Sequence, residues 1–463
     1  MPISQIRVRM APSPTGYVHL GSARTALFDL LFARQNRGRF ILRVDDTDTG
    51  RNHRDYEEAI YDGFRWLGLG WDEGPDVGGE HGPYRQSERL DIYREHAARL
   101  LAAGSAYRCF CTREELGQER ATATAAKLPY RYSRRCLRQP PAGRTEFVVR
   151  LLVPAGQTRF TDLVRGDLEF DNDLIGDPVL VRSDGVALYN FSSPIDDALM
   201  EISHVIRGEE HLSNTPVQLM VLEALGYQRP TAFAHLPVIV GKDRAKLSKR
   251  RHPEARLGLY REMGYLPEAL LNYLALLGWN PGTEEEIFSL PELVDSFRLE
   301  RVQRASAMFD WEKLDWVNAH YIRSLSDDDL SQRLLPFLPD LPPATVRAAA
   351  PALKERLPRL AQAAELLAFL KEAPTPPDLD PGQRQMLELA GQVLAATSPW
   401  TPEAIETALE TLREVRQWSR GKLFTPIRRA VAGSISPPLH HTLALLDQAE
   451  ALARMERSLD PNP

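Results

Sequence analysis

Residue types suited to phosphate binding stand near the start of the chain. Residues 7–22 run from a short strand, through a loop rich in Pro and Gly, into the start of a helix. His19 and Gly21 lie at that turn, where an imidazole can donate to a phosphate and a glycine lets a nucleotide approach the backbone. The N–H groups and dipole of the following helix favour an anion at the same place. The pattern therefore predicts a phosphate-binding site.

A cationic loop much later in the chain supplies further groups for the same chemistry. An apolar strand expected at residues 233–241 leads into Lys-Leu-Ser-Lys-Arg at 246–250. Lys246 and Lys249, on a loop that can close, suit a departing pyrophosphate. The ordinary alternative for such a run is a solvated basic loop. Its position directly after an apolar strand favours the phosphate-binding interpretation.

The elements that must position these groups follow from the hydrophobic pattern. A helix is expected over residues 23–35, with one apolar face, and an apolar strand over 40–44. Strand–helix–strand order predicts a parallel α/β unit, whose ligands lie at the carboxyl ends of the strands. Asp45, the first residue after the second strand, is expected to face the ligand. Further along, two short strands are expected within 178–199, and a helix at 213–225 closed by Gly226.

The two phosphate-binding stretches together resemble the two signatures of class I aminoacyl-tRNA synthetases. Ala-Pro-Ser-Pro-Thr-Gly at 11–16, followed by His19 and Gly21, is similar to the glutamyl/glutaminyl branch, and the resemblance covers the whole chain. It implies that L-glutamate is activated with ATP and Mg²⁺ to glutamyl-adenylate and transferred to the 3′ end of tRNA(Glu). It also implies catalytic roles for His19, Gly21, Lys246 and Lys249.

The same resemblance implies the residues of the two substrate subsites. Those for ATP are Ala11, His19, Gly21, Glu210, Lys246, Leu247, Ser248 and Lys249. Those for glutamate are Arg9, Ser13, Asp45, Tyr189, Ser193 and Arg207. Independently of the family, Arg9 and Arg207 both leave apolar strands, and an arginine holds a carboxylate bidentately while matching a neutral amide poorly.

Two positions depart from the family's pattern. Asp45 stands where glutamate is usual, so the substrate ammonium must lie closer or use a bridging water. Ser193 stands where asparagine is common. The two arginines remain, and glutamate is therefore still the expected amino acid.

All three cysteines fall between residues 109 and 136. Cys109 and Cys111 form a Cys-x-Cys pair, a good start for a tetrahedral zinc site, and Cys136 follows. Tyr132 is the fourth ligand that the resemblance implies, because some zinc-bearing relatives share the Cys-x-Cys…Tyr-x-x-x-Cys arrangement. The alternative is three reduced cysteines in a small core. Basic residues surround this segment with little acid beside them, as a single-stranded RNA end would need, and the resemblance favours such contact over a merely solvated face. They are Lys127, Arg131, Arg134, Arg135, Arg138, Arg144 and Arg150.

The expected fold is α/β, with a Rossmann-like parallel catalytic domain, an inserted α+β acceptor-binding domain and all-α anticodon-binding domains at the C-terminus. The boundaries are 1–84 and 189–244 for the catalytic halves, 85–188 for the insert, 245–324 for a helical stem-contact domain, and 325–373 and 374–463 for two anticodon-binding subdomains. Arg356 approximately matches an arginine that distinguishes the third anticodon base in the family.

Composition and charge narrow the class of protein. Hydrophobic content of 43% and charged content of 26% are typical of a globular protein, and neither a membrane span nor a signal core is evident. A cytoplasmic monomer is expected, the oligomeric state by resemblance. The net charge of −6 argues only weakly against nucleic acid, because charge can be local.

Three alternatives to a tRNA(Glu)-specific enzyme stay open. A related enzyme could charge tRNA(Gln), alone or as well. The glutamyl-queuosine paralogue shares the catalytic core and the cysteine pattern, but its chains end near the catalytic domain, whereas this chain continues far beyond residue 321. A non-catalytic tRNA-binding paralogue would have no need for His19 or Lys246.

Overall fold

The computed structural model describes residues 5–47, 50, 52–128, 130–248 and 251–460. The chain separates into two units, one of residues 1–259 with 270–310 and one of residues 260–269 with 311–463. Helices α8 (Leu257–Glu262) and α9 (Pro267–Leu276) contribute residues to both. Within the described part of the chain, no helix is both long and apolar enough to cross a bilayer.

A parallel strand–helix–strand unit opens the first unit, as the sequence predicts. β1 (Arg7–Met10) pairs in parallel with β2 (Arg39–Leu42), and α1 (Leu20–Gln35) connects them. β1 also lies beside the start of β8 (His204–Gly208), because the N–H of Ser203 donates to the carbonyl of Arg7 at 2.9 Å. The carboxyl ends of these strands therefore meet at one edge, where ligands bind in such folds.

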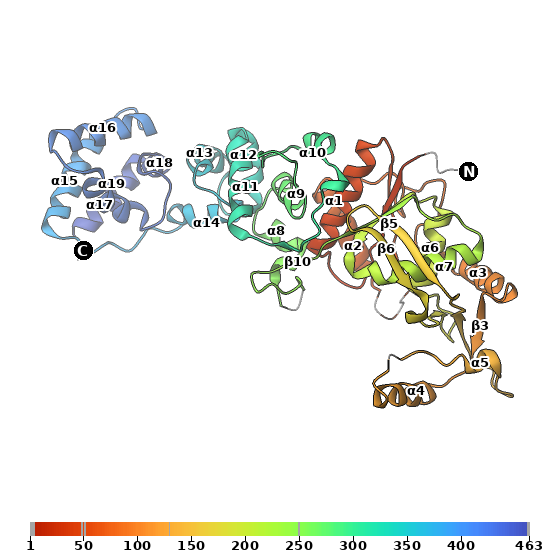
Figure 1. Cartoon of the computed structure of the whole chain (residues 1–463). Coiled ribbons are helices and arrows are strands. Elements are labelled where there is room, and N and C mark those ends of the chain that lie inside the picture. Colours follow the sequence, from red (N-terminus) through yellow and green to blue (C-terminus); the bar gives the residue numbers. More distant parts are fainter. Residues whose placement is uncertain (1–4, 48–49, 51, 129, 249–250, 461–463) are drawn as a thin grey trace. The chain divides into compact units, whose positions relative to one another are not determined.

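A four-stranded sheet follows the order β6–β5–β9–β8. β9 (Ala232–Leu236) lies parallel to both β8 and β5 (Gln157–Asp162), and β5 forms an antiparallel hairpin with β6 (Gly166–Asp171). This hairpin falls within the range expected for the inserted domain, yet it hydrogen bonds to a strand of the catalytic half (Figure 1). The domain boundaries themselves stay predictions.

The remainder of the insert has α+β architecture. Three antiparallel strands follow the order β3–β4–β7. Its elements are α3 (Leu90–Ala102), β3 (Ala106–Cys109), α4 (Arg113–Ala125), α5 (Arg135–Arg138), β4 (Val148–Leu151) and β7 (Val179–Val181). Helix α2 (Arg54–Trp66) precedes the insert in the chain. A buried core that includes Leu100, Leu151 and Phe191 joins this sheet to the helices.

Two expectations for local structure are wrong. The second short strand expected within 178–199 is instead helix α6 (Tyr189–Leu199), because two adjacent aspartates on it turn inward to buried arginines. Helix α1 is buried around its whole circumference rather than on one face, since it packs against β1 and β8 and also against α10 (Leu290–Ser296).

Other predicted elements are confirmed. Helix α7 (Thr215–Leu225) ends at Gly226, whose φ of 75° is the left-handed conformation that glycine accepts at a helix end. β10 (Ile239–Val240) pairs with β11 (Ala307–Met308). From residue 311 to 460 every described regular element is helical (Figure 1), and the α-helices are α11 (Trp311–Ser324), α12 (Asp327–Leu334), α13 (Pro343–Lys354), α14 (Ala363–Leu366), α15 (Pro381–Ala395), α16 (Pro402–Val415), α17 (Arg420–Ala432), α18 (Leu439–Leu445) and α19 (Gln448–Leu459).

Candidate active site

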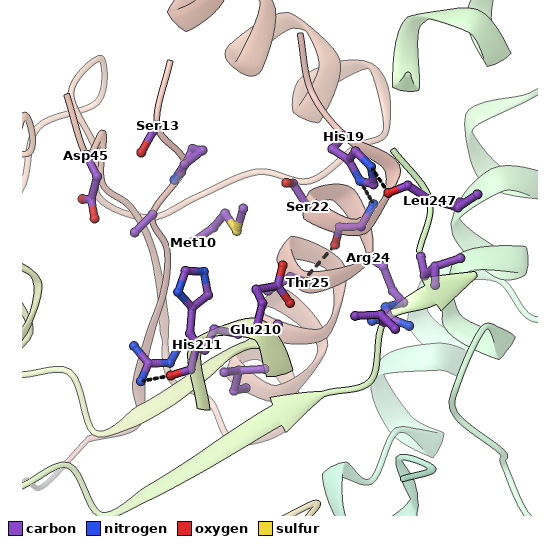
Figure 2. A pocket seen from close by; sticks show the side chains of 18 of the residues that line it. Met10, Ser13, His19, Ser22, Arg24, Thr25, Asp45, Glu210, His211 and Leu247 are labelled. Carbon is purple, nitrogen blue, oxygen red and sulfur yellow. Dashed lines mark hydrogen bonds between the residues drawn. The ribbon is translucent and has the colours of Figure 1, made fainter. Parts of the chain in front are cut away.

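A cavity of about 590 Å³ lies at the carboxyl ends of β1 and β8 and at the N-terminus of α1. Figure 2 shows Ser13 and Asp45 toward one side of it and His19 and Leu247 toward the other, with Glu210 between. It brings together most of the predicted site residues, namely Arg9, Ala11, Ser13, His19, Gly21, Asp45, Tyr189, Arg207, Glu210, Lys246 and Leu247. Its described lining does not include Ser193 or Ser248. Lys249 lies outside the described residues.

Arg207, at the end of β8, is a buried cation with neutral neighbours. Its Nη1 donates to the Tyr189 hydroxyl at 3.1 Å and to Gln218 at 2.8 Å. Its Nη2 donates to Thr215 at 2.8 Å. Among the described residues no carboxylate lies within ion-pair distance of this guanidinium, and burial lowers the pKa of Arg207. A buried cation without a counter-ion favours an anionic ligand, because ligand binding would supply the missing charge.

Arg9 has the opposite environment. Its Nε and Nη2 donate to the two carboxylate oxygens of Asp197 at 3.0 and 3.2 Å. Both side chains are buried, on β1 and α6 respectively. Arg9 therefore enters the cavity with most of its charge already balanced, whereas Arg207 does not.

A network of buried charges lies behind the wall of the cavity that carries Asp45. Arg43, which is fully buried, donates to Asp45 at 2.7 Å and to Asp197 at 2.6 Å. It also donates to the hydroxyl of Ser193 at 3.1 Å, which places Ser193 in this network. Burial raises the pKa of Asp45 to about 6, since it outweighs the attraction of Arg43.

His19 connects the two phosphate-binding stretches. As the N-cap of α1, its Nδ1 accepts from the N–H of Gly21 at 3.0 Å, so its Nε2 carries the proton and donates to the Leu247 carbonyl at 3.1 Å (Figure 2). A Cβ on Gly21 would lie 3.2 Å from Nδ1, so a glycine eases this cap. Lys246, next to Leu247 in the chain, pairs with Glu210 at 3.0 Å. The fold thus joins residues that are more than 200 positions apart in the sequence.

The three cysteines form a cluster with Tyr132. Their sulfur atoms all lie within 4.8 Å of one another, and those of Cys111 and Cys136 are 3.5 Å apart. The Tyr132 hydroxyl lies 3.3 Å from the sulfur of Cys109 and 3.2 Å from that of Cys111. Ligand sulfurs around a tetrahedral zinc ion are separated by about 3.8 Å, given Zn–S bonds of about 2.3 Å. The donor set therefore fits zinc in both chemistry and spacing.

The expectation that little acid accompanies the basic residues of this segment is wrong. Arg134 donates to both oxygens of Asp177, at 2.8 and 2.7 Å. Arg135 and Arg144 pair with Glu115 at 2.7 and 2.8 Å. Asp177 lies in the loop before β7, far from the cysteines in sequence, whereas Glu115 is on α4, between Cys111 and Cys136 but before the run of basic residues. Several of the positive charges thus hold the insert together.

Sequence reasoning missed the acids that set the charge balance of the site. Asp196 accepts from Arg89 at 2.7 Å, and Asp197 accepts from Arg9 and Arg43. The one local signal was an Asp-Asp pair between apolar neighbours, in Pro-Ile-Asp-Asp-Ala-Leu at 194–199. Adjacent carboxylates in such a run are rarely buried without partners.

Comparison with known protein families identifies the class of protein to which the chain belongs. Residues 5–316 match the family model described as "tRNA synthetases class I (E and Q), catalytic domain", and residues 329–459 match an anticodon binding domain. The strands and the helix N-terminus that form the cavity all lie within the first match.

Comparison with individual proteins identifies the particular family within this class. The chain is 45% identical to the glutamate–tRNA ligase of Moorella thermoacetica over 98% of both chains. It is 43% identical to that of Carboxydothermus hydrogenoformans, covering 97% of this chain and 99% of the relative. A crystal structure of the glutamate tRNA ligase of Elizabethkingia meningosepticum in complex with its amino acid matches with a TM-score of 0.87, at 32% identity over 99% of each chain. The chain therefore belongs to the glutamate–tRNA ligase family.

Proposed function

We propose that the cavity activates L-glutamate with ATP and that the chain transfers the glutamyl group to the 3′ end of tRNA(Glu). One observation carries the choice of amino acid: Arg207 is a buried guanidinium with neutral partners among the described residues. A substrate side-chain carboxylate would supply its counter-ion, whereas the neutral amide of glutamine would leave the charge unbalanced.

The rest of the amino acid extends toward Asp45 in this proposal. The Asp45 carboxylate would hold the ammonium group, although it already accepts from Arg43. Ser13 lies on the same side of the cavity and is exposed to it. Arg9 remains a proposed glutamate ligand, but its bidentate pair with Asp197 leaves Nη1 as the nitrogen not engaged by that carboxylate.

The nucleotide would occupy the side formed by His19, Gly21 and the 246–248 segment. An α-carboxylate oxygen attacks the α-phosphorus in line, a P–O bond forms, and the bond to the β-phosphate breaks so that pyrophosphate leaves. The carboxylate is already ionised, so no general base is required. Lys246 would exchange its partner Glu210 for the phosphate charge, and Mg²⁺ would enter with ATP as part of the substrate.

Charging assays test this function directly. Purified tRNA(Glu) and tRNA(Gln) are each offered with glutamate and with glutamine, and the acylated tRNA is measured. We expect glutamate on tRNA(Glu) and no detectable transfer of glutamine, because Arg207 requires an anion. Glutamate on both tRNAs would identify the non-discriminating type. Absence of both charging and tRNA-dependent pyrophosphate exchange would contradict catalysis and favour the RNA-binding paralogue.

Glutamate binding should depend on pH through Asp45. With a pKa of about 6, the carboxylate loses its charge as the pH falls through that value. From about pH 7.5 to about pH 5.5 its ionised fraction falls roughly fourfold, and KM for glutamate should rise by about the same factor. His211, which also lines the cavity, stays neutral over this range, because burial and Arg207 lower its pKa to about 4.

An Asp45→Asn variant provides the control for this pH effect. It should bind glutamate more weakly, with a KM that no longer rises between these pH values. A wild-type KM that is flat with pH would contradict the role of Asp45. The effect of Asp45 on folding stability has the opposite dependence on pH. Because the pKa of Asp45 in the folded chain lies above its ordinary value of 3.8, its contribution to stability is present at low pH and is lost as the pH rises through about 6.

We also propose that Arg356 contacts the anticodon. It is exposed on the second unit, just beyond α13, and lies within the segment that matches an anticodon binding domain. Burial and the charge of Arg356 lower the pKa of Arg428, whose Nε is buried without a partner. Two neighbouring cations of this kind favour RNA phosphate or an acceptor edge of a base.

We propose that Cys109, Cys111, Tyr132 and Cys136 bind a zinc ion. Bound there, it would hold α5 against β3 and so stabilise the fold of the insert. Protein purified without chelators should contain about one zinc per chain by elemental analysis, and Cys136→Ser should lose most of it. Tyr130→Phe, outside the cluster, is the matched control and should keep the metal. Less than half an equivalent in the wild type would contradict the site.

A further inference from the structure

Two fully buried residues behind Arg207 remain outside the proposed chemistry. His235, on β9, accepts at Nε2 from the Nε–H of Arg207, at 3.1 Å. Its Nδ1 lies 2.6 Å from a carboxylate oxygen of Asp162, at the end of β5. These residues and Arg207 therefore form a chain across the sheet, from the inserted hairpin through β9 to the cavity.

The protonation of this chain follows from the chemistry of its members. An arginine Nε–H only donates, so the His235 Nε2 must accept and the ring proton must lie on Nδ1. The Asp162 carboxylate is then the acceptor for that proton. Burial lowers the pKa of His235, so the ring is neutral, and the pKa of Asp162 lies below its ordinary value because hydrogen bonds from His235 and from the backbone outweigh burial.

Asp162 is itself held firmly. One of its oxygens accepts from the N–H groups of Val164 and Arg165 at 2.9 and 2.8 Å, and the other accepts from the His235 backbone at 3.1 Å as well as from its ring. The imidazole is thereby fixed at both ends. Such an arrangement sets the tautomer and orientation of a histidine, as it does for histidines that ligate metals.

The contrast with Arg9 shows what this arrangement achieves. Asp197 balances Arg9 by direct contact and so occupies two of its nitrogens. Asp162 offers its charge to Arg207 through an imidazole that occupies only Nε. The Nη nitrogens of Arg207 then meet only neutral partners, which are Gln218, Thr215, the Tyr189 hydroxyl and the His211 carbonyl; Tyr189 and His211 line the cavity. A buried arginine gains a nearby negative charge without losing its carboxylate-binding edge.

We propose that Asp162 and His235 are positioning residues that orient Arg207 for the side-chain carboxylate of glutamate. This inference rests on the proposed role of Arg207. In an Asp162→Asn variant, an amide facing the ring would favour the other tautomer, whose Nε2–H would oppose the Nε–H of Arg207. His235→Phe would remove the acceptor altogether, and His235→Gln would return an oxygen that can accept from Nε.

Steady-state kinetics of tRNA-dependent pyrophosphate exchange test the proposal. Asp162→Asn and His235→Phe should raise KM for glutamate by about tenfold to a hundredfold while KM for ATP stays within about twofold, and His235→Gln should recover part of the loss. Asp167→Asn is the matched control on the same hairpin, where the carboxylate accepts from Thr161 at 2.9 Å, and should behave as the wild type. An unchanged KM for glutamate, or equal losses for both substrates, would overturn the inference.

Two further measurements separate the sources of failure. If Arg207→Ala leaves KM for glutamate unchanged, the proposed role of Arg207 is wrong. If Arg207→Ala raises this KM but the Asp162 and His235 variants do not, only the positioning role is wrong. Should those variants not fold, neutron diffraction from a deuterated wild-type crystal locates the proton of His235. A proton on Nδ1 supports the inference, and one on Nε2 refutes it.

Discussion

Replacing Arg207 with alanine should lower kcat/KM for glutamate by at least about a hundredfold, which corresponds to about 3 kcal/mol. The substrate carboxylate would enter a buried site with no cation on β8 to meet it, and a buried unpaired charge is costly. KM for ATP should change little, because the proposed nucleotide subsite is formed by His19 and Leu247 on the other side of the cavity. Pyrophosphate exchange in the presence of tRNA measures both quantities.

Two variants control this experiment. Arg207→Lys keeps the charge but not the planar set of donors that contacts Gln218 and Thr215, so it should fall between alanine and wild type. Arg229→Ala removes a half-exposed arginine that pairs with Glu223 near the end of α7, and it should leave activity unchanged. Glutamate kinetics within threefold of wild type for Arg207→Ala would exclude it as the carboxylate-binding residue.

Replacing Arg43 with methionine should destabilise the first unit by about 3–5 kcal/mol, a large part of the ordinary stability of a domain. Arg43 is fully buried and donates to Asp45 and Asp197, with Asp196 3.8 Å away. Methionine fills much of the same volume, so the effect would come from carboxylates left without their cation. Urea unfolding followed by circular dichroism gives the change in midpoint.

A second substitution makes this prediction specific to charge. Arg43→Met combined with Asp45→Asn should recover at least about 1 kcal/mol, because one unpaired charge is then removed. Lowering the pH should also partly rescue the single variant, since a carboxyl with a raised pKa favours the folded state at low pH. Arg54→Met is the control: this arginine is 88% exposed and should change stability by less than about 0.5 kcal/mol. Equal losses in both arginine variants would refute the buried-charge explanation.

The local patterns of the sequence predicted the elements that depend on short-range order. The parallel unit of β1, α1 and β2 followed from strand–helix–strand order, and the end of α7 followed from Gly226. The segment beyond residue 311 is helical, as its composition and spacing indicated. Most residues named for the site line one cavity, because the carboxyl ends of parallel strands converge. Their individual roles stay predictions.

The elements that sequence patterns missed depend on distant partners. Helix α6 was expected to be a strand, and the reason it is a helix lies in Asp197, which reaches Arg9 and Arg43 on other elements. The hairpin of β5 and β6 lies within the range predicted for the insert, and the pairing of its Asp162 with His235 on β9 has no signal in the sequence. A window of sequence contains neither partner.

What the sequence determined by itself is the family of the chain and the residue types at its cavity, because signature motifs are local and strands and helices follow short-range periodicity. What only the tertiary structure decided is the electrostatic state of each of those residues. Arg9 and Arg207 look equivalent in the sequence, since both leave apolar strands. In the folded chain, Asp197 balances Arg9 by direct contact, whereas Arg207 has neutral partners and Asp162 lies behind His235. This difference depends on residues far apart in the sequence, because Asp197 lies 188 residues from Arg9 and Asp162 lies 73 residues from His235.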